Sequence, residues 1–133
     1  MKMLSISTTI GIILASAVTL ARPCATVYNS RECSHRGSEL IMSGDSITDL
    51  NGLSLNSEGR QTDWDNKISR VVVEPNCTFI GYQYQDYNIN YHTGHRLDGF
   101  TLVLDNTRTY RPIDEVLTSY YDDKISSLSC YCR

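Results

Sequence analysis

The stretch Asp63–Val73, DWDNKISRVVV, has a counterpart near the other end of the chain in Tyr120–Cys130, YYDDKISSLSC. Each contains an acidic residue, then an acid or amide, then Lys-Ile-Ser, and each continues into a strand-like segment. The repeated phrases begin at Asp65 and Asp122, which are 57 residues apart. This repetition indicates that one chain contains two copies of a structural unit.

The spacing of the cysteines supports the same division. Cys24 and Cys77 are 53 residues apart, and so are Cys77 and Cys130. Two copies of a four-stranded unit would fill the chain, and packing the two copies together would bury their inner faces. We therefore expect a first motif over about 22–74 and a second over about 75–133.

The N-terminus has the pattern of a secretory signal peptide. A lysine at position 2 is followed by an apolar run at 10–15 and then by small residues, with cleavage expected after Ala17 or Ala21. The run is shorter than the roughly 20 residues that a membrane span requires. We take 1–21 as the signal and expect a secreted, extracellular protein with no membrane attachment after cleavage.

Export would place the five cysteines where disulfides persist. Cys24 and Cys33 could form one bond, and Cys130 or Cys132 could reach Cys77. An odd number leaves one cysteine unpaired or bonded to another chain. Zinc is less favoured, because the last pair has C-x-C rather than C-x-x-C spacing.

The charge balance and the absence of known catalytic motifs limit the classes of function that the sequence suggests. Without the leader the chain has 11 basic and 15 acidic side chains, and no basic cluster suits nucleic acid. No G-x-S-x-G, H-E-x-x-H or phosphate-binding glycine loop occurs. We expect no enzymatic activity and no nucleic-acid partner, whereas the acidic excess suits a cation.

Short segments rich in β-branched and aromatic residues alternate with turn-forming residues, which is typical of an all-β sandwich. The alternation is clearest at Phe100, Leu102 and Leu104. The expected strands are 25–28, 39–42, 69–73, 78–84, 100–104 and 125–131.

One segment has a helical pattern. Arg111–Tyr120 begins with proline and acidic residues and places Ile113, Val116 and Leu117 on one face. It predicts a short helix that closes one end of the sandwich.

The repeated phrases offer the oxygen ligands that Ca²⁺ prefers. Asp-Asn and Asp-Asp also form ordinary turns, but two copies at matching positions favour a metal site over a turn alone. Two loops brought together could exchange ligands and form two sites. The candidate ligands are Asp65, Asn66, the Lys67 carbonyl and Ser69 in one loop, and Asp122, Asp123, the Lys124 carbonyl and Ser126 in the other.

The phrases resemble the calcium-binding signature of the βγ-crystallins, Asn/Asp-Asn/Asp-x-x-Ser/Thr-Ser. Asp122–Ser127 matches every specified position, and Asp65–Arg70 departs only in having Arg70 in place of the last serine. The resemblance covers nearly all of the chain after the leader. It implies an all-β sandwich of two Greek-key motifs with at most one or two short helical turns.

The resemblance also implies a secreted calcium-binding module with a structural or binding role. Its partners would be calcium ions and an extracellular protein or carbohydrate. The alternative is a secreted toxin, effector or protease inhibitor on the same scaffold, which an exposed hairpin at Asn88–His95 would favour.

Two departures from the family concern the hairpins and Arg70. The hairpin signature aromatic-x4-aromatic-x-Gly is stretched in both halves. In the first half, Tyr28 precedes Gly37 by nine residues. The tyrosines at 82, 84, 87 and 91 would form either a binding face or an ordinary twisted aromatic hairpin, and sheet preferences favour the hairpin. If Arg70 lies near the first loop it would repel a cation, so we expect the Asp122 loop to hold the ion more tightly.

Overall fold

The computed structural model describes residues 11, 22–32, 37–51 and 63–133. The predicted signal segment, apart from Gly11, and Cys33 lie outside these residues. Within the described part, no helix is long and apolar enough to cross a membrane.

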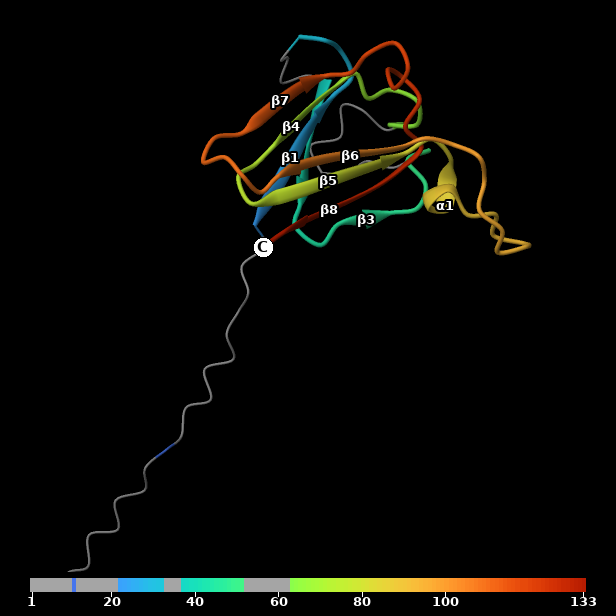
Figure 1. The fold of residues 1–133 in the computed structure, drawn as a ribbon, viewed down its shortest axis with the longest axis horizontal. Coiled ribbons are helices and arrows are strands. Elements are labelled where there is room, and N and C mark those ends of the chain that lie inside the picture. Colours follow the sequence, from blue (N-terminus) through green and yellow to red (C-terminus); the bar gives the residue numbers. More distant parts are fainter. Residues whose placement is uncertain (1–10, 12–21, 33–36, 52–62) are drawn as a thin grey trace, which may run out of the picture.

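Eight strands form two antiparallel four-stranded sheets that pack as a sandwich (Figure 1), so the all-β prediction is confirmed. One sheet has the order β2-β1-β4-β7 and the other β3-β8-β5-β6. The strands are β1 (Pro23–Tyr28), β2 (Ser38–Met42), β3 (Ser46–Ile47), β4 (Arg70–Val73), β5 (Cys77–Tyr82), β6 (Thr101–Asn106), β7 (Ile113–Val116) and β8 (Ser127–Cys132).

Each half of the chain contributes one strand to the sheet of the other half. The third strand of the first motif, β3, pairs with β8, and the third strand of the second motif, β7, pairs with β4. Exchanging the two motifs reproduces the same strand order, so the repeat seen in the sequence is a repeat of Greek keys. Neither motif completes a four-stranded sheet alone.

The helix expected over Arg111–Tyr120 is wrong. Ile113–Val116 is an edge strand paired with β4 along its whole length. As a strand, this segment pairs with the otherwise unpaired backbone groups of β4 over four residues. The hydrogen bonds of this tertiary pairing outweigh the local helical preference. Within the described residues, the helical element is the single turn α1 (Gln85–Asn88), between β5 and β6.

Alternation along the strands builds the core. β6 buries every second residue, as the sequence predicts, and Phe79 and Gly81 of β5 face the same interior. Gly81 leaves room for a neighbouring side chain, because a Cβ there would lie 2.8 Å from Cδ1 of Ile125 and would force that side chain to move. The largest fully buried side chains are Trp64, Phe79, Ile41, Leu50, Ile68, Leu117, Ile125 and Leu128.

Two disulfides close the same end of the sandwich. Cys24 on β1 bonds Cys130 on β8, which joins the two sheets, and Cys77 on β5 bonds Cys132 on β8 within one sheet. Residues two apart on a strand point to the same face, which explains how a C-x-C pair serves both bonds. A Cys24–Cys33 bond is therefore wrong, whereas Cys77–Cys132 is one of the two pairings expected for Cys77.

Removing either disulfide should cost about 2–5 kcal/mol of unfolding free energy, because each bond restricts a long loop in the unfolded chain. The bonds span 106 and 55 residues. Loop-closure entropy grows slowly with length, so urea unfolding of Cys24→Ala/Cys130→Ala and Cys77→Ala/Cys132→Ala should differ by no more than about 1 kcal/mol. Non-reducing peptide mapping that linked Cys24 to Cys33 would contradict this arrangement.

An ion pair fastens the edge strand β7 to β4. The guanidinium of Arg70 donates two hydrogen bonds to the carboxylate of Asp114, one of them 2.6 Å long from Nε, and a third to the carbonyl of Arg31. The hydrogen bonds from Arg70 lower the pKa of Asp114, against a smaller opposing effect of partial burial.

Because the pKa of Asp114 is lower in the folded state, the pair stabilises the fold above pH ~4 and this contribution disappears as pH falls through that pKa. Asp114→Asn should cost less than about 1 kcal/mol at pH 7, since both side chains are partly exposed. The loss should shrink as pH falls below about 4 and vanish once pH is below the lowered pKa of Asp114. Glu115→Gln on the same strand is the control, and equal losses from both variants would contradict a specific role for the pair.

Candidate metal centre

The two repeated loops lie against each other and exchange backbone hydrogen bonds. The amide of Asn66 donates to the carbonyl of Ile125 at 3.0 Å, and the amide of Asp123 donates to the carbonyl of Ile68 at 3.1 Å. Positions 66 and 123 are equivalent in the repeat, as are 68 and 125. The contact between the loops is therefore reciprocal.

Each loop has the same backbone shape. Asn66 and Asp123 both adopt a left-handed conformation with φ of 55°. Asn and Asp tolerate this region better than other non-glycine residues. The second position of the phrase thus needs Asn or Asp for its backbone as well as for any ligand role.

The serines are anchored in the same way. The amide of Ser69 donates to the carbonyl of Tyr28 at 2.8 Å, and the amide of Ser126 donates to the carbonyl of Tyr82 at 2.9 Å. Both serines are buried. Each loop is therefore attached to the end of the first strand of its own motif.

The serine side chains, in contrast, reach across to the other loop. Ser69 Oγ donates to Asp123 Oδ1 at 3.0 Å, and Ser126 Oγ donates to Asn66 Oδ1 at 3.3 Å. Two mixed oxygen clusters result, and only the Ser69–Asp123 cluster contains a carboxylate in this pairing. The sequence anticipated exchange between loops but not which cluster would carry the charge.

The first acid of each phrase has an unsatisfied oxygen. Asp65 Oδ1 and Asp122 Oδ1 are buried and have no hydrogen-bond partner among the residues that the structure describes. A buried unpaired carboxylate oxygen is costly, and natural proteins rarely keep one without a ligand or strain that explains it. The same oxygen is unpaired at equivalent positions of both loops.

The donor set fits a hard cation. Hydroxyl, amide and carboxylate oxygens are present, and no described residue donates a hydrogen bond to the carbonyl of Lys67 or Lys124. Among the residues that the structure describes, the group of closely spaced soft ligands is Cys24, Cys77 and Cys132, whose sulfurs belong to the disulfides. Among these described residues, no three carboxylates of the loops lie close enough together to form one cluster.

Arg70 has a different role from the one expected. Its side chain binds Asp114 and the Arg31 carbonyl, so its charge is matched on the outer sheet edge. Repulsion by Arg70 therefore gives no reason to expect the Asp65 loop to be the weaker one.

Sequence reasoning missed Asp63. Its Oδ1 accepts a hydrogen bond from the amide of Asp65 at 2.9 Å and so braces the first loop. The equivalent position of the second loop is Tyr120, which lacks this carboxylate. The sequence could have indicated this role, because Asp63 stands two residues before the first turn. Asp commonly accepts a hydrogen bond from the backbone amide two residues further along the chain.

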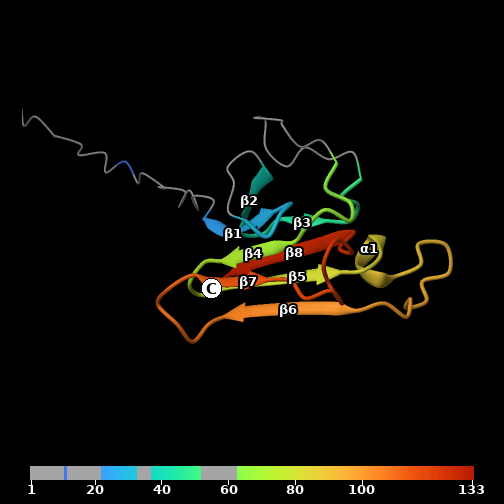
Figure 2. The ribbon, with the colours of Figure 1, turned by 90° about the horizontal axis from the view of Figure 1, so that it is seen from above.

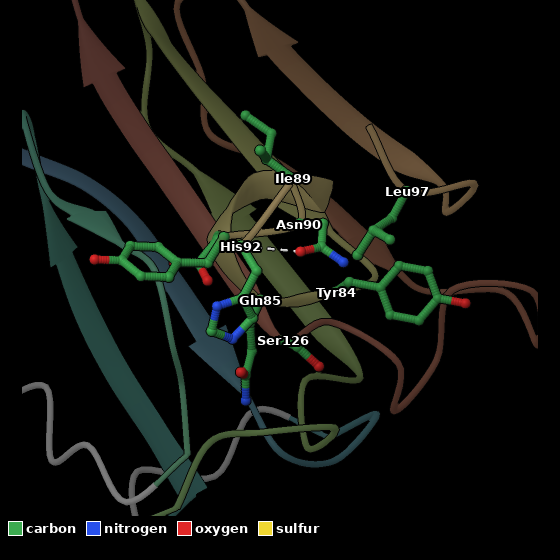
Figure 3. Close-up of a pocket in the computed structure, with 9 residues that line it drawn as sticks. Tyr84, Gln85, Ile89, Asn90, His92, Leu97 and Ser126 are labelled. Carbon is green, nitrogen blue, oxygen red and sulfur yellow. Dashed lines mark hydrogen bonds between the residues drawn. The ribbon is translucent and has the colours of Figure 1, made fainter. Parts of the chain in front are cut away.

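A pocket of about 470 Å³ opens beside Ser126 (Figure 3). Its other walls come from the segment 84–97, which contains α1 and the connection toward β6. In Figure 3, Tyr84 and Leu97 lie on one side and Gln85 and His92 on the other. In Figures 1 and 2 this segment projects from one end of the sandwich, and 91–96 are exposed.

Comparison with known proteins identifies the fold but no closer relative. No family model matches the sequence, and no curated protein matches it. One similar solved structure concerns the evolution of the eye lens βγ-crystallin domain fold, with a TM-score of 0.57 and 17% identity. The alignment covers 85% of this chain and 89% of that chain.

A mutant βγ-crystallin domain from Clostridium beijerinckii is also similar, with a TM-score of 0.52 and 14% identity over 81% of this chain and 97% of that chain. A double mutant of a βγ-crystallin domain from the same organism has a TM-score of 0.50 and 18% identity. That alignment covers 81% of this chain and 96% of that chain. Together with the exchanged strands, these similarities show that the chain has the βγ-crystallin domain fold.

Proposed function

We propose that this protein is an exported calcium-binding module whose role is structural or binding rather than enzymatic. The observation that carries the proposal is the pair of buried, unpartnered carboxylate oxygens on Asp65 and Asp122. Ca²⁺ accepts an irregular shell of about six to eight oxygens, which loops of mixed carboxylate, amide, carbonyl and hydroxyl groups can supply.

Two sets of residues would hold the ions. Ser69 and Asp123 lie together in one set, and Ser126 and Asn66 in the other. Asp65 and Asp122, with the carbonyls of Lys67 and Lys124, would complete them. A bound ion would supply positive charge that offsets the acidic side chains and would link the two motifs at the point where their loops meet.

The exposed segment 91–96 favours an outward binding role over a purely structural one. This feature is also what a secreted effector or inhibitor on the same scaffold would present. The calcium loops and the projecting segment occupy adjoining regions, because Ser126 contributes to both.

Calcium should raise the melting temperature of the protein, and magnesium should do so far less, because Mg²⁺ requires a regular octahedral shell. At calcium 100 times the dissociation constant, each independent site should add about 2.7 kcal/mol. The measurement is thermal unfolding in calcium, magnesium and chelator.

Asp65→Asn/Asp122→Asn is the matched variant, since it keeps shape but removes charge from the two unpaired oxygens. It should lose most of the calcium response while gaining stability in chelator, where the unpaired charges are no longer buried. Identical melting curves of the natural protein in calcium and chelator would refute the proposal.

The two sites should differ in affinity because only the Ser69–Asp123 pair contains a carboxylate, and affinity depends on ligand charge. Calorimetric titration should resolve two steps. Ser69→Ala should weaken the tighter step and Ser126→Ala the looser one, each by about tenfold or more, as expected when a ligand worth at least ~1.4 kcal/mol is lost.

Ser129→Ala, a serine of β8 outside the loops, is the control and should leave both steps unchanged. Loss of the tighter step in Ser126→Ala would show that the second loop acts as its own site, against the pairing across the loops.

A further inference from the structure

The pocket beside Ser126 has a preformed wall. α1 is a left-handed turn in which Asp86, Tyr87 and Asn88 all have positive φ, at 52°, 57° and 60°. Three consecutive non-glycine residues in this region carry strain that the surroundings must hold. Such conformations concentrate at ligand clamps and active sites.

The surroundings do hold this turn. The amide of Asp86 donates to the carbonyl of Thr48 at 2.8 Å, and the amide of Tyr87 donates to Ser127 Oγ at 3.1 Å. The fully buried Asn88 donates from Nδ2 to the carbonyl of Phe100 at 2.8 Å and accepts at Oδ1 from the amide of Tyr84 at 2.9 Å. The wall is therefore fixed by contacts to both motifs before any ligand arrives.

The aromatic side of the pocket is also fixed. A Cβ on Gly99 would lie 2.7 Å from the ring of Tyr84, so the tyrosine packs directly on the glycine backbone. Tyr91 is 83% exposed and contacts His92 edge to face at 5.8 Å. Two tyrosines thus line the pocket, Tyr84 packed on the fold and Tyr91 largely exposed to solvent.

The polar groups offer both donors and acceptors. Asn90 uses Oδ1 to accept from the amides of His92 and Thr93, which leaves its NH₂ group as a donor. Asp86 and Gln85 supply carboxylate and amide oxygens. None of the residues lining the pocket is lysine or arginine. This set disfavours an anion, and the NH₂ donor of Asn90 disfavours a simple cation.

A sugar ring fits these features. Each hydroxyl of a pyranose both donates and accepts, and its C–H face packs on the apolar face of an aromatic ring. The volume of about 470 Å³ lies within the range of about 300–1,000 Å³ typical of small-ligand sites. We propose that the pocket formed by 84–97 and Ser126 binds neutral pyranose residues of an oligosaccharide.

The test mixes the purified protein, in chelator, with hexasaccharides of glucose, galactose, mannose or N-acetylglucosamine. Binding is measured by calorimetry and by backbone amide NMR. At least one should bind with a Kd below about 1 mM and shift resonances of 84–97. Tyr91→Ala should weaken binding at least about tenfold, as truncation of an aromatic anchor does. Tyr110→Ala, which removes another highly exposed tyrosine, in the β6–β7 connection, should change the Kd less than about twofold.

Absence of binding by all four hexasaccharides, or equal effects of the two tyrosine variants, would overturn the proposal. Binding of tetramethylammonium at 84–97 in place of the sugars would assign the pocket to a cation. The Asp65→Asn/Asp122→Asn variant should keep sugar binding. Loss of sugar binding in this variant, or sugar binding that requires calcium, would mean that a metal rather than this pocket holds the sugar. Failure of the calcium proposal would leave sugar binding in chelator unchanged.

Discussion

The architecture depends on the reciprocal contact between the two Lys-Ile-Ser loops. Two backbone hydrogen bonds, Asn66 to Ile125 and Asp123 to Ile68, connect the halves at their point of symmetry. Ile68 and Ile125 are completely buried beneath these bonds and belong to the shared core. A change in either loop therefore acts on the register of the motifs as well as on local oxygen positions.

Strand exchange has the same effect at a larger scale. β3 and β7 each complete the sheet of the opposite motif, so the apolar face of one half is covered only when the other half is folded. We therefore expect the sandwich to unfold as one cooperative unit although its sequence contains a repeat. The disulfide between β1 and β8 adds a covalent link between the same two sheets.

Much of this fold could be predicted from the sequence because its strands alternate and its loops repeat. Phe100, Leu102 and Leu104 face inward as their spacing indicates. The segment at Ile113–Val116 could not be assigned from local pattern, because its pairing partner β4 lies far away in the chain. Local spacing favours a helix there, and only the unpaired edge of the opposite motif makes a strand more stable.

The candidate metal site was also predictable only in part from the sequence. Local motif chemistry identified the loops, and the structure places the eight suggested residues in two adjoining loops. The pairing of Ser69 with Asp123 and of Ser126 with Asn66 arises from tertiary contact and could not be read from either loop alone. The bracing contact of Asp63 and the left-handed turn at 86–88 likewise depend on backbone geometry that side-chain patterns do not report.

β8 has a consequence for synthesis of the chain. Both disulfides use its cysteines, and Cys130 follows its partner Cys24 by 106 residues. Neither bond can form until β8 has emerged from the ribosome, and β1 and β5 remain without their covalent partners until then. Cys24 and Cys77 must therefore stay reduced, or bonded only transiently, until residues 127–132 have been made. An oxidant that acts before then would trap wrong pairings between the cysteines already made.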